Sequence, residues 1–261
     1  MDKYESILKL WQKWNVKTST DIDLRLDSFR VLFAYNSGKI ENDAITYNDT
    51  REIFENGQVL NYSGNPRAIF ETQNQRLCYE FLKSKMATRE TLSVSLVKSI
   101  HEILTSGTYD ERRYITQNER PGEFKKHDYV TGIAEVGSSP EDVEHDLDEL
   151  INEIKDFKGL DTLKAATYLH ARFEYIHPFA DGNGRVGRTL QNYFLITNNH
   201  PPIIIYDEDK RSYYDALACY DKAEEIAPLF DFLKAQTEKT WDKSLQREQK
   251  RERDSNVEIE Y

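Results

Sequence analysis

Residues 177–188, with the sequence HPFADGNGRVGR, hold the side chains of this chain that are best suited to chemistry. Pro178 does not continue a preceding helix comfortably, so we expect the chain to turn there. Gly182 and Gly184, on either side of Asn183, allow the backbone to approach a ligand closely. The N–H groups of such a loop, with the unpaired N–H groups of a helix that follows, form an anion-binding concavity.

The charged residues of this segment suit a polyphosphate. Arg185 and Arg188 are three residues apart and are therefore neighbours on a helix, and two guanidinium groups match the spread charge of a polyphosphate. Asp181 beside them needs a cation, for which Mg²⁺ on a nucleotide is the obvious candidate. His177 is the group nearby that can accept a proton at neutral pH. Together these residues predict a site for phosphoryl or nucleotidyl transfer.

Hydrophobic residues recur at helical spacing over most of the chain, which predicts the elements that position this segment. The expected helices cover residues 24–32, 92–104, 143–154, 162–176, 186–196, 213–220 and 229–241. The acidic residues just before Val143 are typical of a helix start, because they lie at the positive end of the helix dipole. One predicted helix thus ends just before His177, and the next begins near Arg185.

Residues 123–137 show no helical period, and glycines recur at 122, 132 and 137. We interpret residues 126–135 as a short strand pair, or flap. The predicted fold class is therefore all-α with one small β-hairpin. The predicted organisation is an N-terminal helical segment over residues 1–65, a core domain over 66–240 and a charged C-terminal tail over 241–261.

Composition limits the partners and the compartment. The chain has 261 residues and a formal net charge of −11, so neither nucleic acid nor an anionic membrane is a default partner. Cys78 and Cys219 are far apart and lack metal-ligand spacing, which argues against a disulfide framework or a zinc site. The N-terminus is charged and amphipathic, unlike a signal peptide, and no apolar run reaches transmembrane length. A cytoplasmic protein is expected.

Residues 177–188 resemble the Fic motif, HPFx(D/E)GNGRxxR, at every specified position. The resemblance extends less closely over residues 53–233. It implies a Fic-type helical bundle with a β-hairpin flap. It also implies a protein adenylyltransferase, which transfers AMP from ATP to a Ser, Thr or Tyr hydroxyl of a target protein and to itself.

The resemblance implies a role for each residue of the motif. His177 resembles the base that deprotonates the target hydroxyl, and Asp181 resembles the Mg²⁺ ligand. Arg185 and Arg188 resemble the phosphate-binding arginines, with Arg188 at the γ-phosphate. The remaining nucleotide-binding residues implied by the motif are Gly182, Asn183, Gly184, Val186 and Gly187.

Two further segments resemble family elements outside the motif. The flap aligns the target as an added strand, and the residues expected to line it are Tyr129, Val130, Thr131 and Gly132. Tyr213 and Tyr214 resemble residues that flank the nucleotide. Asp221 stands where many family members have Asn, so a direct contact of this side chain with the base is in doubt.

Residues 37–42, SGKIEN, resemble the inhibitory motif (S/T)xxxE(G/N) of regulated Fic proteins. Ser37 and Glu41 are four residues apart, so on a helix they share a face. In the family the glutamate pairs with the second arginine of the motif, here Arg188, and removes it from the γ-phosphate. Because residues 37–42 precede the Fic motif in the same chain, they indicate the intramolecular, self-inhibited subclass.

Other activities stay open. Removal of AMP, with Glu41 positioning a water, is a second possible activity of the same site. Gly184 argues against the kinase version of the fold, which has lysine there, and Asp181 argues against phosphocholine transfer. A non-catalytic peptide-binding module is the alternative from another class, whereas a metal hydrolase would need more ligands than Asp181 and His177. The sequence leaves open a homo-oligomer, the target and a nucleotide other than ATP.

Overall fold

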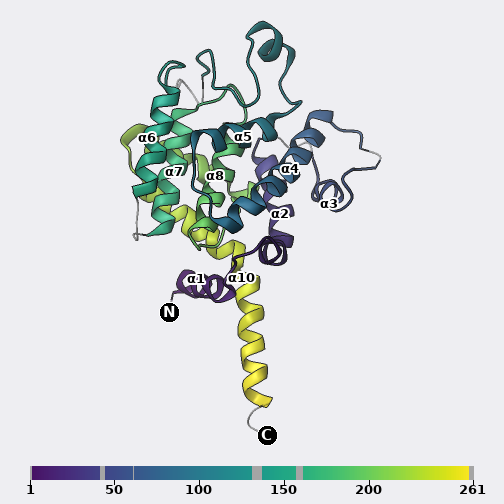
Figure 1. Cartoon of the computed structure of the whole chain (residues 1–261). Helices are drawn as coiled ribbons and strands as arrows, with labels where there is room; N and C mark the ends of the chain where they lie inside the picture. The colour runs from purple at the N-terminus through teal and green to yellow at the C-terminus, as the bar shows by residue number, and fades with distance from the viewer. Residues whose placement is uncertain (1, 42–44, 61, 131–136, 157–160, 259–261) are drawn as a thin grey trace.

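The computed structural model describes residues 2–41, 45–60, 62–130, 137–156 and 161–258. Within these ranges the chain forms helices and loops, with no strand, so the predicted all-helical fold is confirmed (Figure 1). The α-helices are α1 (Lys3–Trp14), α2 (Ser19–Glu41), α3 (Tyr47–Asn56), α4 (Pro66–Thr88), α5 (Val94–Thr105), α6 (Val143–Asp156), α7 (Thr162–Ile176), α8 (Asn183–Thr197), α9 (Lys210–Ala223) and α10 (Ala227–Glu258). A π-helical turn, η1, covers Arg112–Thr116, and a 3₁₀ turn, η2, covers Asp207–Asp209.

Helix α8 lies at the centre of the bundle and packs against α7, α5, α4 and α2 (Figure 1). Its apolar residues, such as Val186, Leu190 and Leu195, are fully buried, and so are Arg185 and Arg188. A helix buried on all sides belongs to the core of a domain. Helix α8, which contains the second half of residues 177–188, is therefore held rigidly by its neighbours.

Every helix predicted from hydrophobic spacing is present, and α4 is the long helix that the spacing did not reveal. Its buried face carries Glu71, Thr72, Asn74 and Gln75, so it has no clean apolar stripe. Its start does carry a recognisable signal, because Pro66 stands in the first turn after Asn65, whose side chain accepts a hydrogen bond from the N–H of Arg67.

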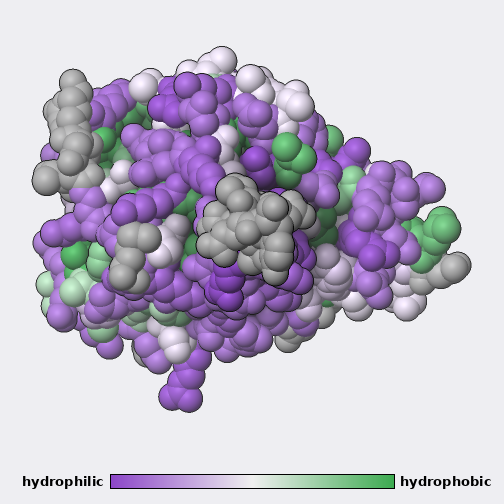
Figure 2. All heavy atoms as spheres, turned by 90° about the horizontal axis from the view of Figure 1, so that it is seen from below, coloured by the Kyte–Doolittle hydropathy of each residue, from purple (hydrophilic) through white to green (hydrophobic). Residues whose placement is uncertain are grey.

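Helix α1 packs against α10 at the lower side of the bundle (Figure 1). Trp11, Trp14 and Trp241 form a cluster with edge-to-face contacts and ring centroids 5.5–6.0 Å apart. Beyond Trp241, α10 continues as one helix to Glu258 and projects from the bundle. The surface seen from this side is mostly hydrophilic, with small scattered hydrophobic groups (Figure 2). None of the described helices has the length and apolar character of a membrane span.

The predicted β-hairpin is not seen in the described part of the flap, residues 126–130. The N–H of Lys126 donates to the buried carboxylate of Glu119, with an N–O distance of 3.0 Å, and the Tyr129 hydroxyl donates to the same carboxylate at 2.9 Å. Glu119 thus takes the backbone N–H of Lys126, which a partner strand would otherwise accept. Thr131 and Gly132 lie outside the described residues.

Candidate active site

His177 is held at the turn between α7 and α8. It caps α7 in a left-handed conformation (φ 50°, ψ 60°), and its N–H donates to the carbonyl of Phe173 at 3.1 Å. A non-glycine residue with positive φ is uncommon, and such residues concentrate at functional sites. Burial and the nearby charge of Lys125 lower the pKa of His177 to about 4. The imidazole is therefore neutral at pH 7 and able to accept a proton.

The loop after His177 is fixed by Asn183. Its side-chain amide donates to the carbonyl of Phe179 at 2.7 Å, and its side-chain oxygen accepts from the N–H of Phe179 at 2.9 Å. Asn183 was expected to cradle phosphates, but its buried side chain is occupied with the loop. Its backbone N–H, in the first turn of α8, remains in a position to face an anion.

His101 on α5 is a second support of this loop that the sequence analysis did not identify. Its ring stacks on the buried Phe179, with centroids 3.7 Å apart and planes 4° from parallel. Nδ1 accepts from the N–H of Gly122 at 2.9 Å, so the ring proton is on Nε2, which donates to the carbonyl of Asp181 at 3.0 Å. Burial lowers the pKa of His101 to about 3 and keeps this neutral form. The ring thereby ties the loop to the chain segment that leads into the flap.

The start of α8 is the place where the anion-binding nest was predicted. Gly182 precedes the helix with φ 83°, and it has no side chain that could cap the first N–H groups. At Gly184, an added Cβ would lie 2.5 Å from Oε1 of Glu41 and 2.9 Å from Nη1 of Arg188. Glycine at this position therefore lets both charged groups approach the backbone. The N–H groups of the first helical turn have no intrahelical acceptors and suit an anion.

Asp181 and Arg185 are engaged by α4, through residues that the sequence analysis missed. Arg67 donates from Nη2 to Oδ2 of Asp181 at 2.5 Å and from Nε to Oε1 of Glu71 at 2.8 Å. Nη1 of Arg185 lies 3.1 Å from the same Glu71 oxygen. Burial favours a higher pKa for Asp181, but Arg185 and Arg67 outweigh it, so the pKa is lowered and the carboxylate is ionised.

Asp181 and the nest fit a magnesium nucleotide. Mg²⁺ in nucleotide sites is usually held by one or two carboxylates, substrate phosphates and several waters. Asp181 offers an ionised carboxylate next to the N–H groups of α8. Nη1 of Arg185 is paired with Glu71, whereas its Nε makes no hydrogen bond to the described residues and is the donor left for a phosphate acceptor.

Arg188 is held by the end of α2. Its Nη2 donates to Oε1 of Glu41 at 2.7 Å and to the carbonyl of Ser37 at 3.1 Å, and its Nε donates to the Ser37 hydroxyl at 3.0 Å. The side chain of Arg188 is 2% exposed, and that of Glu41 is 35% exposed. Burial favours a higher pKa for Glu41, but Arg188 outweighs it and the pKa is lowered. Ser37 thus contacts the arginine through both its hydroxyl and its carbonyl.

The two tyrosines predicted to flank the nucleotide have different environments. Tyr213 is fully buried, and its hydroxyl lies 2.7 Å from Nε2 of His170, so it contributes to the wall behind Arg188. Tyr214 is exposed and remains free to contact a ligand. Next to this wall, Oε1 of Glu174 is sealed from solvent without a hydrogen-bond partner among the described residues, and burial raises the pKa of Glu174 to about 7.

Gly187 makes room for Glu174, because an added Cβ would lie 2.4 Å from its Oε1. Val186 is fully buried and packs in the core. Both residues were predicted to bind nucleotide as part of the motif. In the structure their side-chain positions serve the packing of α8.

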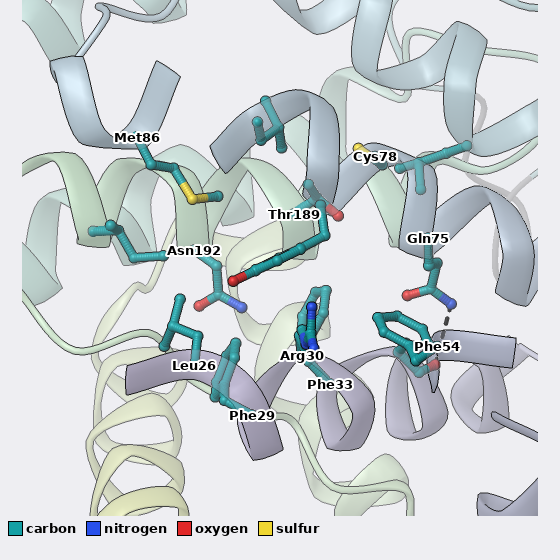
Figure 3. Close-up of a pocket in the computed structure, with 15 residues that line it drawn as sticks. Leu26, Phe29, Arg30, Phe33, Phe54, Gln75, Cys78, Met86, Thr189 and Asn192 are labelled. Atoms are coloured by element: carbon teal, nitrogen blue, oxygen red, sulfur yellow. Dashed lines mark hydrogen bonds between the residues drawn. The ribbon is translucent and has the colours of Figure 1, made fainter. Parts of the chain in front are cut away.

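A cavity of about 40 Å³ lies between α2, α4 and α8, where residues 26–34 of α2 line it (Figure 3). Phe29, Phe33 and Met86 contribute apolar walls, and Thr189 and Asn192 of α8 line it from the other side. The seam between α2 and the core is therefore incompletely packed. Such a void weakens the attachment of α2, because the atoms that line it lose contacts.

Comparisons with known proteins agree with this geometry. Residues 91–195 match the model of the Fic/DOC family. The chain is 28% identical over 193 residues to protein adenylyltransferase fic-1 of Caenorhabditis elegans, covering 71% of this chain and 35% of that protein. It is 28% identical over 215 residues to protein adenylyltransferase Fic of Nematostella vectensis, covering 81% of this chain and 48% of that protein. The chain thus spans less than half of the length of these relatives.

Solved structures share the fold. A Fic domain-containing signalling protein from Bacteroides thetaiotaomicron superimposes with a TM-score of 0.80 at 22% identity, over 94% of this chain and 96% of that one. Fic-1 from C. elegans, residues 134–508, superimposes with a TM-score of 0.76 at 22% identity, over 97% of this chain and 72% of that one. Residues 91–195 thus match the Fic/DOC family model, and the chain shares its fold with these Fic structures.

Proposed function

We propose that the chain is a protein adenylyltransferase that transfers AMP from ATP to a Ser, Thr or Tyr hydroxyl of a target protein. The observation that carries the proposal is a neutral His177 at the turn that opens the arginine-rich nest of α8. Relatives at 28% identity are named protein adenylyltransferases, which supports the same reaction.

In the proposed reaction, the nest and Arg185 hold the phosphates, and His177 takes the proton of the incoming hydroxyl. The hydroxyl oxygen forms a bond to the α-phosphorus, and the bond from that phosphorus to the bridging oxygen breaks, so pyrophosphate leaves. Mg²⁺, when bound at Asp181, supplies charge neutralisation for the phosphate oxygens. The main contribution of the protein is positioning and electrostatic stabilisation, as in phosphoryl transfer generally.

We propose further that Glu41 inhibits this reaction from within the chain. It occupies Arg188, the arginine assigned to the γ-phosphate, at 2.7 Å, and it places a negative charge at the nest. Residues 1–65 act in this proposal as the inhibitory segment, residues 66–240 as the Fic core and residues 241–261 as the tail. Removal of AMP with a water positioned by Glu41 is the second candidate activity, because this carboxylate lies beside the nest.

The flap over residues 126–135 is proposed to dock the target. Val130 is exposed at its described end and is available to a target strand. Pairing with an extended target segment would supply the strand partner that the flap lacks in its described part. We also propose that the chain attaches AMP to itself. A cytoplasmic location is proposed as well, and the free thiols of Cys78 and Cys219 support it.

The test is incubation with ATP and Mg²⁺ followed by mass spectrometry of the chain itself and of proteins from a lysate. An adduct of AMP mass is expected on the wild-type chain and none on His177→Ala, while calorimetry shows ATP binding in both. An adduct of phosphate mass would instead indicate a kinase. Transfer retained by His177→Ala would overturn the proposed base, and equal loss of ATP binding would assign this residue a structural role.

A further inference from the structure

Arg67, at the start of α4, occupies the carboxylate to which the metal is assigned. Its Nη2 lies 2.5 Å from Oδ2 of Asp181, and its Nε donates to Glu71 at 2.8 Å. Neither the Fic motif nor the inhibitory segment contains Arg67. Its guanidinium therefore adds a cation to the site that no role described above explains.

The described ion pairs around the nest balance one another. Three carboxylates face three guanidinium groups, and the members of this set are Glu41, Glu71, Asp181, Arg67, Arg185 and Arg188. A divalent cation at Asp181 would sit close to the guanidinium of Arg67, and two cations at this separation repel each other strongly in a partly buried site.

Arg67 differs from Arg185 in its freedom to move. The side chain of Arg67 is 33% exposed, whereas that of Arg185 is 3% exposed. Arg67 stands in the first turn of α4, so its side chain can change partner while the helix and its Asn65 cap stay in place. Glu71 is 5% exposed and accepts from Nε of Arg67, so the end of the Arg67 guanidinium can rotate while Nε keeps this contact.

We propose that Arg67 is a built-in cation that holds Asp181 in the nucleotide-free protein and transfers to the β- and γ-phosphates when magnesium and ATP bind. This inference rests on the proposed function, because it assigns the metal to Asp181 and the phosphates to the nest. Arg67 becomes a third phosphate-binding arginine, supplied by α4. Guanidinium groups suit both partners, since they bind carboxylates and phosphates with the same planar donor geometry.

The proposal is tested first with Mn²⁺ alone, titrated into the nucleotide-free full chain and followed by the loss of the free-ion EPR signal. Arg67→Gln is expected to bind Mn²⁺ about tenfold more tightly than the wild type, because a nearby positive charge has been removed. Asp181→Asn added to Arg67→Gln is expected to abolish the gain. Arg247→Gln, on the remote part of α10, is the matched control and is expected to leave the affinity unchanged.

The second measurement is calorimetry of ATP and AMP binding at saturating Mg²⁺, the condition in which Arg67 is proposed to move from Asp181 to the phosphates. Arg67→Gln is expected to weaken ATP about tenfold and AMP less than twofold, since AMP lacks the β- and γ-phosphates. The proposal requires both the gain in Mn²⁺ affinity and the selective loss of ATP affinity. Either shift without the other overturns it.

A second variant covers the case in which Arg67→Gln loosens α4. Arg67→Lys keeps the charge but, as a compact ammonium, reproduces poorly the paired contacts to Asp181 and Glu71. It is expected to show both shifts in reduced size, and their absence in a folded Arg67→Lys overturns the proposal. Neither measurement depends on AMP transfer. An inactive chain that shows both shifts would overturn the proposed function alone, and an active chain that shows neither would overturn the role of Arg67 alone.

Discussion

The contact between Glu41 and Arg188 predicts that Glu41→Gly releases the enzyme. The structure places a charge-assisted hydrogen bond of 2.7 Å between a guanidinium that is 2% exposed and a carboxylate that is 35% exposed. Such bonds contribute about 1.5–3 kcal/mol when shielded from water. Because solvent reaches one third of Glu41, the lower part of that range, about 1.5–2 kcal/mol, applies. This corresponds to a rise of about 10- to 30-fold in productive ATP binding, and so in self-labelling.

The assay is the initial rate of label incorporation per molecule from ATP labelled at the α-phosphate, at equal ATP and Mg²⁺. Glu41→Gln, which keeps the shape without the charge, is expected to fall between the wild type and Glu41→Gly. Ser37→Ala is expected to raise the rate less than Glu41→Gly, because the Ser37 carbonyl still accepts from Arg188. Equal rates for wild type and Glu41→Gly, with both chains folded and both nucleotide-competent, would refute the inhibitory role of this pair. The double variant with His177→Ala should be inactive.

Three further outcomes are expected. Arg188→Ala should weaken ATP more than AMP in calorimetry, and equal effects would contradict its place at the γ-phosphate. The free energy of unfolding, from urea titrations, should fall by at least about 1 kcal/mol when the pH is lowered from about 7.5 to about 5.5. His101, His170, His177 and His200 have pKa values lowered to about 3–4, so below about pH 6.5 they take up protons only when unfolded, and each contributes about 1.4 kcal/mol per pH unit. Glu174, with its pKa raised to about 7, opposes part of this fall because it takes up a proton in the folded state. A constant free energy in a Glu174→Gln background would refute the neutral burial of these histidines. Ala34→Val adds carbons to the cavity of about 40 Å³ and should fix α2 more tightly to the core. It should therefore raise the melting temperature and lower the rate of self-labelling. An unchanged rate would show that this cavity has no part in the control of Arg188.

The sequence by itself determined the local chemistry of the site. The order of residues 177–188 dictates a helix end, a turn at Pro178 and a new helix with exposed N–H groups, because each step depends on neighbours in the chain. Helices with a clean apolar stripe, such as α6 and α7, were predicted for the same reason. The spacing of Ser37 and Glu41 predicted one helix face, and that is where both residues lie.

Only the tertiary structure decided which distant groups complete the site. Arg67 and Glu71 reach Asp181 and Arg185 from more than a hundred residues away, and α4 gave no apolar period because its inner face is polar. His101 looked like an ordinary residue of α5 until its ring was seen stacked on Phe179. Contacts of this kind depend on how helices cross, and the linear order of residues does not contain that geometry. The sequence therefore specifies the loop that binds the anion, and the packing of α2, α4 and α5 around α8 decides which charges surround it.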